Sequence, residues 1–357
     1  MTPPGHPPRS DAVAWLRLTL SQSRAQARRS LAAHGSDPEA AAAALGPLSA
    51  DAQDRLSRSR NWLEGGPNRS VLTLADADYP SALLHSPDPP LALFLEGRRD
   101  QLHQPGFAIV GSRHPTAAGL ETAREYAEWA AGAGWAVVSG LALGIDGAAH
   151  SGALKSGVTW AVLGTGLDQI YPPRHRALAA RIAEHGLLIS EHPPGTPPIP
   201  AHFPVRNRII AGLSQACLVV EAALKSGSLV TARLASEANR EVFAIPGSIR
   251  SLQSQGCHWL IQQGAKLVQC PQDILDEMPS PQTVMPSALP VDAPVLGSGP
   301  ASDPVVVALG VDELGFDALH ARLGGSVPEL LGRLLSLELE GRIQRLPGDR
   351  FRRLARA

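Results

Sequence analysis

The sequence has few cysteines and no excess of either charge. Its three cysteines, Cys217, Cys257 and Cys270, are an odd number without Cys-x-x-Cys spacing. This pattern argues against a disulfide framework or a zinc site and favours a reducing compartment. The 32 Lys and Arg residues nearly cancel the 33 Asp and Glu residues. No overall field therefore attracts nucleic acid, and any basic surface has to be local.

Long apolar runs are missing as well. The segment Met1–Pro8 has no apolar stretch of the kind found in secretory signals. No later segment reaches the roughly 18 continuous apolar residues that a membrane-spanning helix needs. We therefore expect a cytoplasmic protein with no membrane partner.

The sequence also lacks the motifs of several common enzyme classes. The dinucleotide fingerprint Gly-x-Gly-x-x-Gly does not follow the first expected strand, where Gly111–Arg113 stands, and there is no phosphate-binding Gly-x-x-x-x-Gly-Lys-Ser/Thr loop. Ser139 lies in no Gly-x-Ser-x-Gly elbow. Asp146 and His150 are four residues apart. We interpret Asp146 as a helix cap or a loop tie, that is, a side chain that hydrogen-bonds its own loop, and His150 as a packing histidine. These absences predict no catalytic residues, no cofactor and no metal site.

Composition and length predict several domains. Residues 1–66 are rich in Ala, Leu and Arg, with an apolar spacing that suits short helices broken at Gly35 and Gly46. Residues 67–275 contain an irregular cover segment, Val71–Gly97, followed by alternating strand and helix patterns.

The remaining residues divide in two. Residues 276–304 are acidic, rich in proline and free of Lys and Arg, which predicts a flexible linker. Residues 305–357 then form a last domain, whose final segment from Gly341 holds six arginines and one aspartate.

The central residues alternate between short apolar runs and helical patterns. Continuous apolar runs of this length are typical of strands buried on both faces. Strands that alternate with helices predict right-handed crossovers and an α/β fold with a doubly wound, mostly parallel sheet. The expected strands are Phe107–Gly111, Trp135–Ser139, Thr159–Leu163, Leu187–Ser190, Cys217–Glu221 and Glu241–Ile245.

Small and basic residues follow these strands, where ligands of such sheets bind. Ser226–Ser228 comes before an expected helix in the manner of a phosphate-binding turn. Any one glycine here could be a tight turn, but several such loops meet at one sheet edge and indicate a nucleic-acid site. The candidates from these loops are Gly111, Ser112, Arg113, Gly140, Gly164, Gly166, Lys225, Ser226, Gly227 and Ser228.

The segment His202–Ile210 adds an aromatic ring to this site. A helix that begins near Val205 would place Arg206 and Asn207 beside its free N–H groups, with Phe203 just ahead. A ring beside cations and amide donors is what a nucleotide strand needs, since the base stacks and the phosphate is neutralised. The alternative is a capped helix whose phenylalanine anchors a loop and whose arginines are solvated.

The ordered motifs of residues 71–276 resemble the DNA-processing protein A family (DprA, also Smf) of bacterial natural transformation. The chain differs from the pattern just upstream of Phe203, where the loop reads Ile199–Ala201 and the basic residue found in some members is absent. The motifs that carry the resemblance are Gly111–Arg113, Ser139–His150, Gly164–Pro172, Phe203–Ile210, Val220–Ala222, Ser226–Ser228, Pro246–Gly247 and Leu260–Ala265.

The resemblance implies an extended Rossmann-like domain that binds single-stranded DNA, forms a homodimer and loads the RecA recombinase, without catalysis. Arg113, Phe203, Arg206, Asn207 and Lys225 are then the expected strand contacts. A single-stranded DNA-binding protein is a further expected partner.

The resemblance extends to both ends of the chain. It implies a helical module similar to a sterile alpha motif in residues 1–66 and a winged helix in residues 305–357. A second helix over Val327–Arg342 and a hairpin over Ile343–Arg353 fit the winged helix. That module suits protein contacts at least as well as DNA. His258 and Leu267 are the candidates for the dimer surface, with ordinary core packing as their alternative.

Two other functions stay open at this point. A Rossmann-like nucleotide phosphoribohydrolase would use Glu221 as its catalytic carboxylate, although its Pro-Gly-Gly-x-Gly-Thr loop is absent. A recombinase scaffold that binds no nucleic acid would have no use for Phe203 or Arg113.

Overall fold

The protein was analysed as a computed structural model. It describes residues 12–20, 23–86, 88–281, 305, 314–323, 327–339, 343–346 and 350–353. The chain divides into two compact units, Met1–Pro286 and Ser287–Ala357, and each is described by itself. Of the expected linker, residues 282–304 lie outside the described part of the chain.

Four helices open the first unit and confirm the prediction of short helices in this region. Asp37 caps α3 by accepting hydrogen bonds from the N–H groups of Glu39 and Ala40, and Ser49 caps α4 by accepting from Ala52 N. The helices are α1 (Ala12–Thr19), α2 (Arg24–Ala33), α3 (Pro38–Ala44) and α4 (Ala50–Glu64).

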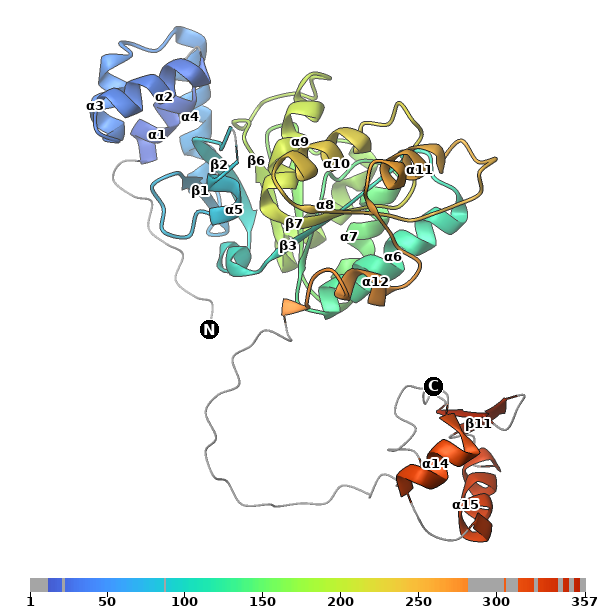
Figure 1. Cartoon of the computed structure of the whole chain (residues 1–357). Coiled ribbons are helices and arrows are strands. Elements are labelled where there is room, and N and C mark those ends of the chain that lie inside the picture. The colour runs from blue at the N-terminus through green and yellow to red at the C-terminus, as the bar shows by residue number, and fades with distance from the viewer. Residues whose placement is uncertain are drawn as a thin grey trace, which may run out of the picture. The chain divides into compact units, whose positions relative to one another are not determined.

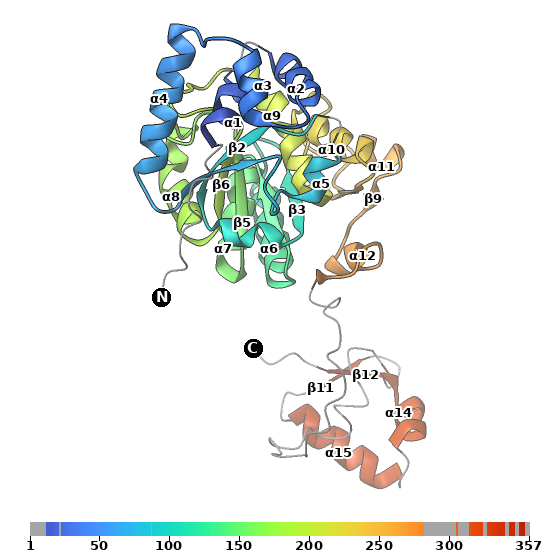
Figure 2. The ribbon, with the colours of Figure 1, turned by 90° about the vertical axis from the view of Figure 1, so that its left-hand side faces the viewer.

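These helices share a core with the sheet. Leu16 and Trp62 are buried against Phe94 of the second strand, and the Trp62 and Phe94 rings meet edge to face at 5.9 Å. The helical residues therefore pack directly on the α/β part of the unit, as Figures 1 and 2 show.

A nine-stranded sheet organises the first unit, in the order β1-β2-β6-β5-β4-β3-β7-β8-β9. The strands from β6 to β9 in this order pair in parallel, while β2 pairs antiparallel with both of its neighbours, β1 and β6. All six expected strands form, so the prediction of a mostly parallel α/β sheet is confirmed. The strands are β1 (Arg69–Thr73), β2 (Ala92–Gly97), β3 (Gly106–Val110), β4 (Ala136–Ser139), β5 (Thr159–Leu163), β6 (Leu187–Ser190), β7 (Ser214–Val219), β8 (Glu241–Ala244) and β9 (Lys266–Leu267).

Helices cover both faces of this sheet (Figures 1 and 2). Neighbouring residues of one strand enter different cores: Trp160 and Val162 face one side, and Ala161 faces the other. The helices α9 (His202–Leu213), α10 (Ser228–Glu237) and α11 (Gln255–Gln262) cover the face of the sheet to which Trp160 belongs. On the opposite face lie α6 (Ala117–Gly132), α7 (Ile145–Ser156), α8 (Arg176–His185) and α12 (Pro271–Leu275).

The chain changes direction across the sheet next to β3. From β3 it passes through β4 and β5 to β6, and it then returns to β7 on the other side of β3. The loops after β3 and β7 therefore diverge, which leaves a crevice at their carboxyl ends.

Two details of the sequence interpretation are wrong. Val71–Gly97 is not irregular, because it contains β1, β2 and the short helix α5 (Ser81–Leu84). Helix α9 begins at His202 rather than near Val205, so Phe203 lies within its first turn. Pro204 also fits that turn, where backbone N–H groups have no partner inside the helix.

The second unit has the predicted winged-helix elements. Helices α14 (Phe316–Leu323) and α15 (Val327–Leu339) accompany a sheet of β10 (Leu314–Gly315), β12 (Arg350–Arg353) and β11 (Ile343–Leu346). Strands β11 and β12 form the expected antiparallel hairpin. The hydrophobic core of the second unit includes Val305, Leu319, Leu330, Leu334, Leu337, Ile343 and Phe351.

The structure adds one observation on membranes. None of the helices in the described ranges combines the length and the apolar character that crossing a bilayer requires.

Candidate nucleic-acid interface

A cleft of about 640 Å³ opens where the loops after β3 and β7 diverge. Its lining comes from the ends of β3, β4, β5 and β7 and from the first turns of α9 and α10. Ten of the thirteen predicted DNA-binding residues line it: Gly111, Ser112, Arg113, Phe203, Arg206, Asn207, Lys225, Ser226, Gly227 and Ser228.

The other three predicted residues, Gly140, Gly164 and Gly166, do not line the cleft. A Cβ on Gly140 would lie 2.4 Å from Nη1 of Arg206, and one on Gly164 would lie 3.1 Å from Cδ1 of Phe203. These two glycines therefore make room for lining residues. Contact of the three glycines with DNA stays a prediction.

Two aromatic rings and a cation lie together on the α9 side of the cleft. The Arg113 guanidinium carbon is 6.0 Å from the centre of the Phe203 ring. Tyr171 also lines the cleft, with its ring centre 5.6 Å from that of Phe203 and its side chain 46% exposed. Arg113 has no ion pair within the described ranges, so its charge is available to an anion.

Arg206 is buried at 5% exposure, unlike Arg113. Its Nη1 donates to Gly140 O at 2.7 Å and also to Val162 O. Burial lowers the pKa of Arg206 to about 10, although the nearby Asp146 acts in the opposite direction. The guanidinium therefore stays charged at neutral pH, and it holds together the ends of β4 and β5.

Asp146 ties the loop between β4 and α7. Its Oδ2 accepts from Gly140 N at 3.1 Å and from Ala142 N at 3.3 Å, which confirms the interpretation as a loop tie. Burial raises the pKa of Asp146, opposed by Arg206 and by these two N–H groups. The side chain lines the cleft but is 7% exposed.

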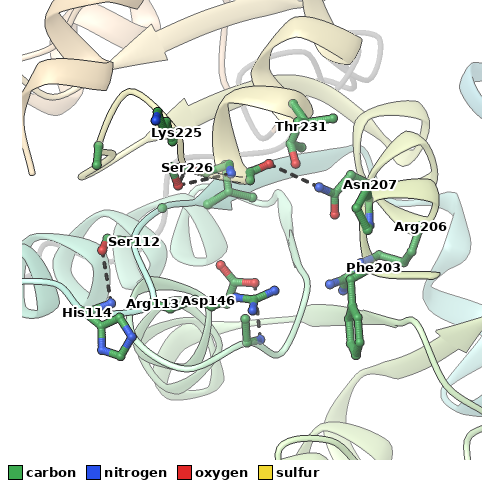
Figure 3. Close-up of a pocket in the computed structure, with 18 of the residues that line it drawn as sticks. Ser112, Arg113, His114, Asp146, Phe203, Arg206, Asn207, Lys225, Ser226 and Thr231 are labelled. Atoms are coloured by element: carbon green, nitrogen blue, oxygen red, sulfur yellow. Dashed lines mark hydrogen bonds between the residues drawn. The ribbon is translucent and has the colours of Figure 1, made fainter. Parts of the chain in front are cut away.

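The loop after β7 forms another wall. Figure 3 shows Lys225 and Ser226 across the cleft from Phe203. Ser226 Oγ lies 2.7 Å from Ser228 Oγ and accepts from Ser228 N at 3.3 Å. This turn leads into α10, whose N-terminal end carries partial positive charge. Lys225 is exposed and forms no ion pair with any described residue.

The polar residues of the first turns of α9 have separate tasks. Asn207 lines the cleft and its Nδ2 donates to Gly227 O at 3.3 Å, which joins α9 to the opposite wall. Arg208 points elsewhere and pairs with Glu191 at 2.6 Å and Asp88 at 3.3 Å. Arg24 of α2 joins the same two carboxylates. Through Asp88 and Glu191, Arg208 therefore connects α9 to the N-terminal helix α2.

His150 is buried away from the cleft, as a packing residue would be. Thr159 Oγ1 donates to Val137 O, so its lone pair accepts from His150 Nδ1 at 2.7 Å. His150 Nε2 is buried without a partner among the described residues. Burial lowers the pKa of His150 to about 3, and the neutral ring is the form that the core holds.

Glu221 does not line the cleft. Its Oε1 accepts from Thr116 Oγ1 at 2.6 Å and its Oε2 accepts from Thr116 N at 2.9 Å. A Cβ on Gly119 would lie 2.4 Å from the same carboxylate. The carboxylate is therefore held by hydrogen bonds at the start of α6.

Sequence reasoning missed several lining residues, including Tyr171, His114, Gln253 and Thr231. The Tyr-Pro pair at the end of the third strand-end motif was a signal for Tyr171. Gln253 gave none, because it comes from a loop after β8, and its Nε2 donates to His114 O at 2.9 Å. Within the described ranges, no three His, Cys, Asp or Glu side chains are placed to hold a metal ion.

The two candidate dimer residues lie near the edge of the sheet. Leu267 is on β9, the last strand, and is 37% exposed. His258 is on α11, and its Nε2 lies 3.0 Å from Gly247 O. Trp259, also exposed at 41%, follows it.

The fold and the cleft define a Rossmann-like α/β protein with an open, partly basic crevice and a separate winged helix. Residues 70–279 match the family model for DNA recombination-mediator protein A, and residues 290–349 match that for the DprA winged helix domain. The chain belongs to the DNA recombination-mediator protein A family, whose role lies in DNA processing and recombination. The resemblance seen in the motifs is confirmed.

Two relatives show how far the similarity extends. Protein Smf of Escherichia coli is 46% identical over 313 residues, which cover 85% of this chain and 82% of Smf. The DNA processing protein DprA of Streptococcus pneumoniae is 47% identical over 212 residues, which cover 59% of this chain and 74% of DprA.

Solved structures agree with the fold. The X-ray structure of DprA from Streptococcus pneumoniae has a TM-score of 0.65 at 38% identity, over 74% of this chain and 97% of that chain. A DprA structure from Helicobacter pylori, described as giving insights into a single-stranded DNA binding mode, has a TM-score of 0.54 at 32% identity. That match covers 58% of this chain and 94% of that one.

Proposed function

We propose that the cleft binds single-stranded DNA. The observation that carries this proposal is the meeting of three features at one sheet edge: the Phe203 ring, the Arg113 guanidinium and Lys225. Neither cation has an ion pair with a described residue, whereas Arg208, also on α9, forms ion pairs with Asp88 and Glu191. A strand supplies both a base for the ring and phosphates for the cations.

Each lining residue has a distinct task in this proposal. Phe203 stacks on a base, and Gly164 leaves the room in which its ring rests. Arg113 and Lys225 neutralise phosphates from opposite walls, helped by the N-terminal end of α10 and the Ser226–Ser228 turn. Gly111 and Ser112 bring the backbone close to the strand, and Asn207 donates to it or to Gly227 O.

In this proposal Arg206 fixes the wall of the cleft and adds a positive charge beneath it. Its Nη1 is used by two backbone carbonyls, so its positive charge reaches the cleft from beneath without a free Nη1 donor. Binding of this kind tolerates any sequence, because every base has a face on which an aromatic ring can stack.

The relatives support the same function. The Helicobacter pylori DprA structure is described by its single-stranded DNA binding mode, and this chain shares its fold at 32% identity. We further propose that the chain loads RecA recombinase onto single strands during natural transformation, in the cytoplasm and beside a single-stranded DNA-binding protein. Membership of the recombination-mediator family supports this step.

Self-association and domain limits belong to the same proposal. A homodimer would use His258 and Leu267, and the exposure of Leu267 on an edge strand supports that surface. We propose a helical domain in residues 1–66, a Rossmann-like domain in 67–275, a linker in 276–304 and the winged helix in 305–357.

Enzymatic activity has little support. A nucleotide phosphoribohydrolase would need the Glu221 carboxylate beside its substrate, but Glu221 does not line the cleft and its carboxylate is hydrogen-bonded to Thr116 at the start of α6. We therefore propose a binding protein rather than a hydrolase.

Fluorescence anisotropy with oligo-dT and with a blunt duplex tests the proposal. If about four phosphates are neutralised, log K falls against log[salt] with a slope near −3, at about −0.7 per phosphate on single strands. The duplex should bind far more weakly. Equal affinity for both forms would contradict the proposal, and no binding to either would favour a scaffold that uses no DNA.

RecA loading has its own test. The protein should accelerate RecA filament formation on oligo-dT that is covered by a single-stranded DNA-binding protein, and Arg113→Ala should reduce that acceleration. Acceleration that is unchanged by Arg113→Ala would separate loading from the cleft.

A further inference from the structure

Two exposed arginines lie just beyond the cleft, where the third strand-end loop leads into α8. Arg174 is in the 3-10 turn η2 (Pro173–His175), and Arg176 is the first residue of α8. Both are exposed. Neither forms an ion pair or a side-chain hydrogen bond within the described ranges, although most other arginines of this unit do.

The turn that carries them is fixed against the cleft wall. His175, between the two arginines, donates from Nδ1 to Leu141 O at 2.9 Å. Its ring also lies over Gly147, where a Cβ would be 2.7 Å from Cε1. Leu141 precedes Ala142, which lines the cleft. The position of the two arginines is therefore set by the wall itself.

Tyr171 joins this turn to the cleft. It lines the cleft, its ring centre is 5.6 Å from that of Phe203, and the two rings are inclined by 48°. Arg176 is the fifth residue after Tyr171, so the backbone between them spans at most about 17 Å. A DNA strand that extends from Phe203 along Tyr171 would reach both arginines within a few nucleotides.

The local charges favour an anionic occupant. The first turn of α8 holds no acidic residue and no side chain caps it. Cations at this end of a helix are unfavourable without an anion nearby. Asp168, the acidic residue of the preceding loop, is already bound, since its Oδ1 accepts from Gly195 N at 2.8 Å.

We propose that Tyr171, Arg174 and Arg176 form an exit track for the DNA strand that leaves the cleft. The Tyr171 ring stacks on the base after the one on Phe203, and the two arginines bind the next phosphates. This inference depends on the proposed function, because it extends the same binding surface beyond the cleft.

The test compares a short oligo-dT of about four nucleotides, which fills only the cleft, with one of about twenty. The double variant Arg174→Gln/Arg176→Gln should bind the long oligonucleotide at least tenfold more weakly. Its salt slope should be smaller by about 1.4, which is two contacts at about 0.7 each. Binding of the short oligonucleotide should stay within twofold of wild type.

A matched control removes the same charge elsewhere. Arg29 of α2 and Arg60 of α4 are also exposed and have no ion pair with a described residue. Arg29→Gln/Arg60→Gln should bind both oligonucleotides like wild type. Tyr171 itself lines the cleft, so Tyr171→Ala should weaken both oligonucleotides without changing the salt slope, because it removes stacking rather than a phosphate contact.

The outcomes separate the two proposals. If Arg113→Ala weakens both oligonucleotides while Arg174→Gln/Arg176→Gln binds the long one like the control pair, the exit track is wrong and the cleft stands. The track would also be overturned if Arg174→Gln/Arg176→Gln, with an unchanged melting temperature, lost the same amount of affinity for the short and the long oligonucleotide. If the wild-type protein binds neither length, the proposed function itself fails.

Discussion

The guanidinium carbon of Arg113 lies 6.0 Å from the centre of the Phe203 ring, although the two residues are 90 positions apart in the sequence. The loop after β3 supplies the cation, and the first turn of α9 supplies the ring. Both line one cleft. A nucleotide between the walls can therefore meet a stacking face and a phosphate partner at the same time.

Arg113 and Phe203 should fail in different ways when they are removed. Arg113→Ala should lower the salt slope of oligo-dT binding by about 0.7, because one phosphate contact is lost. Phe203→Ala should cost about 1–3 kcal/mol of binding and leave the slope unchanged, because stacking does not release counterions. Anisotropy titrations at several salt concentrations measure both quantities. Wild-type binding by both variants, at normal thermal stability, would show that the site is wrongly assigned.

Arg206 should behave as a structural residue as well as a charged one. Arg206→Ala removes the donor of two backbone carbonyls at the ends of β4 and β5 and leaves them buried. Loss of a buried charged partner predicts a decrease of about 3 kcal/mol in the free energy of unfolding, measured with urea. Arg113→Ala is the control, since Arg113 is exposed and should leave stability unchanged. Equal stability of the two variants would contradict this assignment.

Gly140 should not tolerate a side chain. A Cβ there would lie 2.4 Å from Nη1 and 2.7 Å from Cζ of Arg206, and the guanidinium cannot move without losing its two carbonyl bonds. Gly140→Ala should therefore lower the free energy of unfolding by about 1–3 kcal/mol. Gly132→Ala in α6 is a matched control, because the nearest atom to its Cβ is 3.7 Å away. Thermal melts of the two variants that coincide would refute the crowding at Gly140.

His150 should make stability depend on pH. Burial lowers its pKa to about 3 in the folded protein, from 6.5 in an unfolded chain, so the unfolded state binds the extra proton in between. The free energy of unfolding should decrease as pH falls below 6.5, by up to about 1.4 kcal/mol per pH unit from this group. His192, whose pKa burial lowers to about 4, contributes with the same sign.

The variant His150→Asn isolates the first contribution. Its amide can keep a bond to Thr159 Oγ1 but does not titrate. The variant loses stability at pH 7 from the smaller side chain, yet its stability should fall less steeply than that of the wild type between pH 6.5 and 4. Parallel stability curves over this range would mean that the ring is not held neutral.

Much of this architecture could be predicted from the sequence. The six buried parallel strands were predictable because continuous apolar runs between helical patterns have few other interpretations. The strands β1 and β2 were missed, since they lie among prolines and turn residues. Phe94 is buried in a core that it shares with Leu16 and Trp62 of distant helices.

The sequence predicted which residues line the candidate site better than it predicted what each of them does there. Strand-end loops locate Arg113 and Lys225, because the ends of parallel strands share one edge. Arg206 and Arg208 are two residues apart on one helix, yet one is buried on two carbonyls and the other pairs with Glu191 and Asp88. Those partners come from far along the chain, so no local pattern distinguishes the two arginines.

Photo-cross-linking tests the central claim most directly. An oligo-dT that carries 5-iododeoxyuridine at single positions is bound to the full-length protein, irradiated and digested, and the linked peptide is identified by mass spectrometry. The account predicts linkage to the peptide that contains Phe203, and its loss in Phe203→Ala while Arg113→Ala retains it at low salt. Linkage confined to the winged-helix residues 314–353, with none at Phe203, would contradict the account and move the DNA site to the second unit.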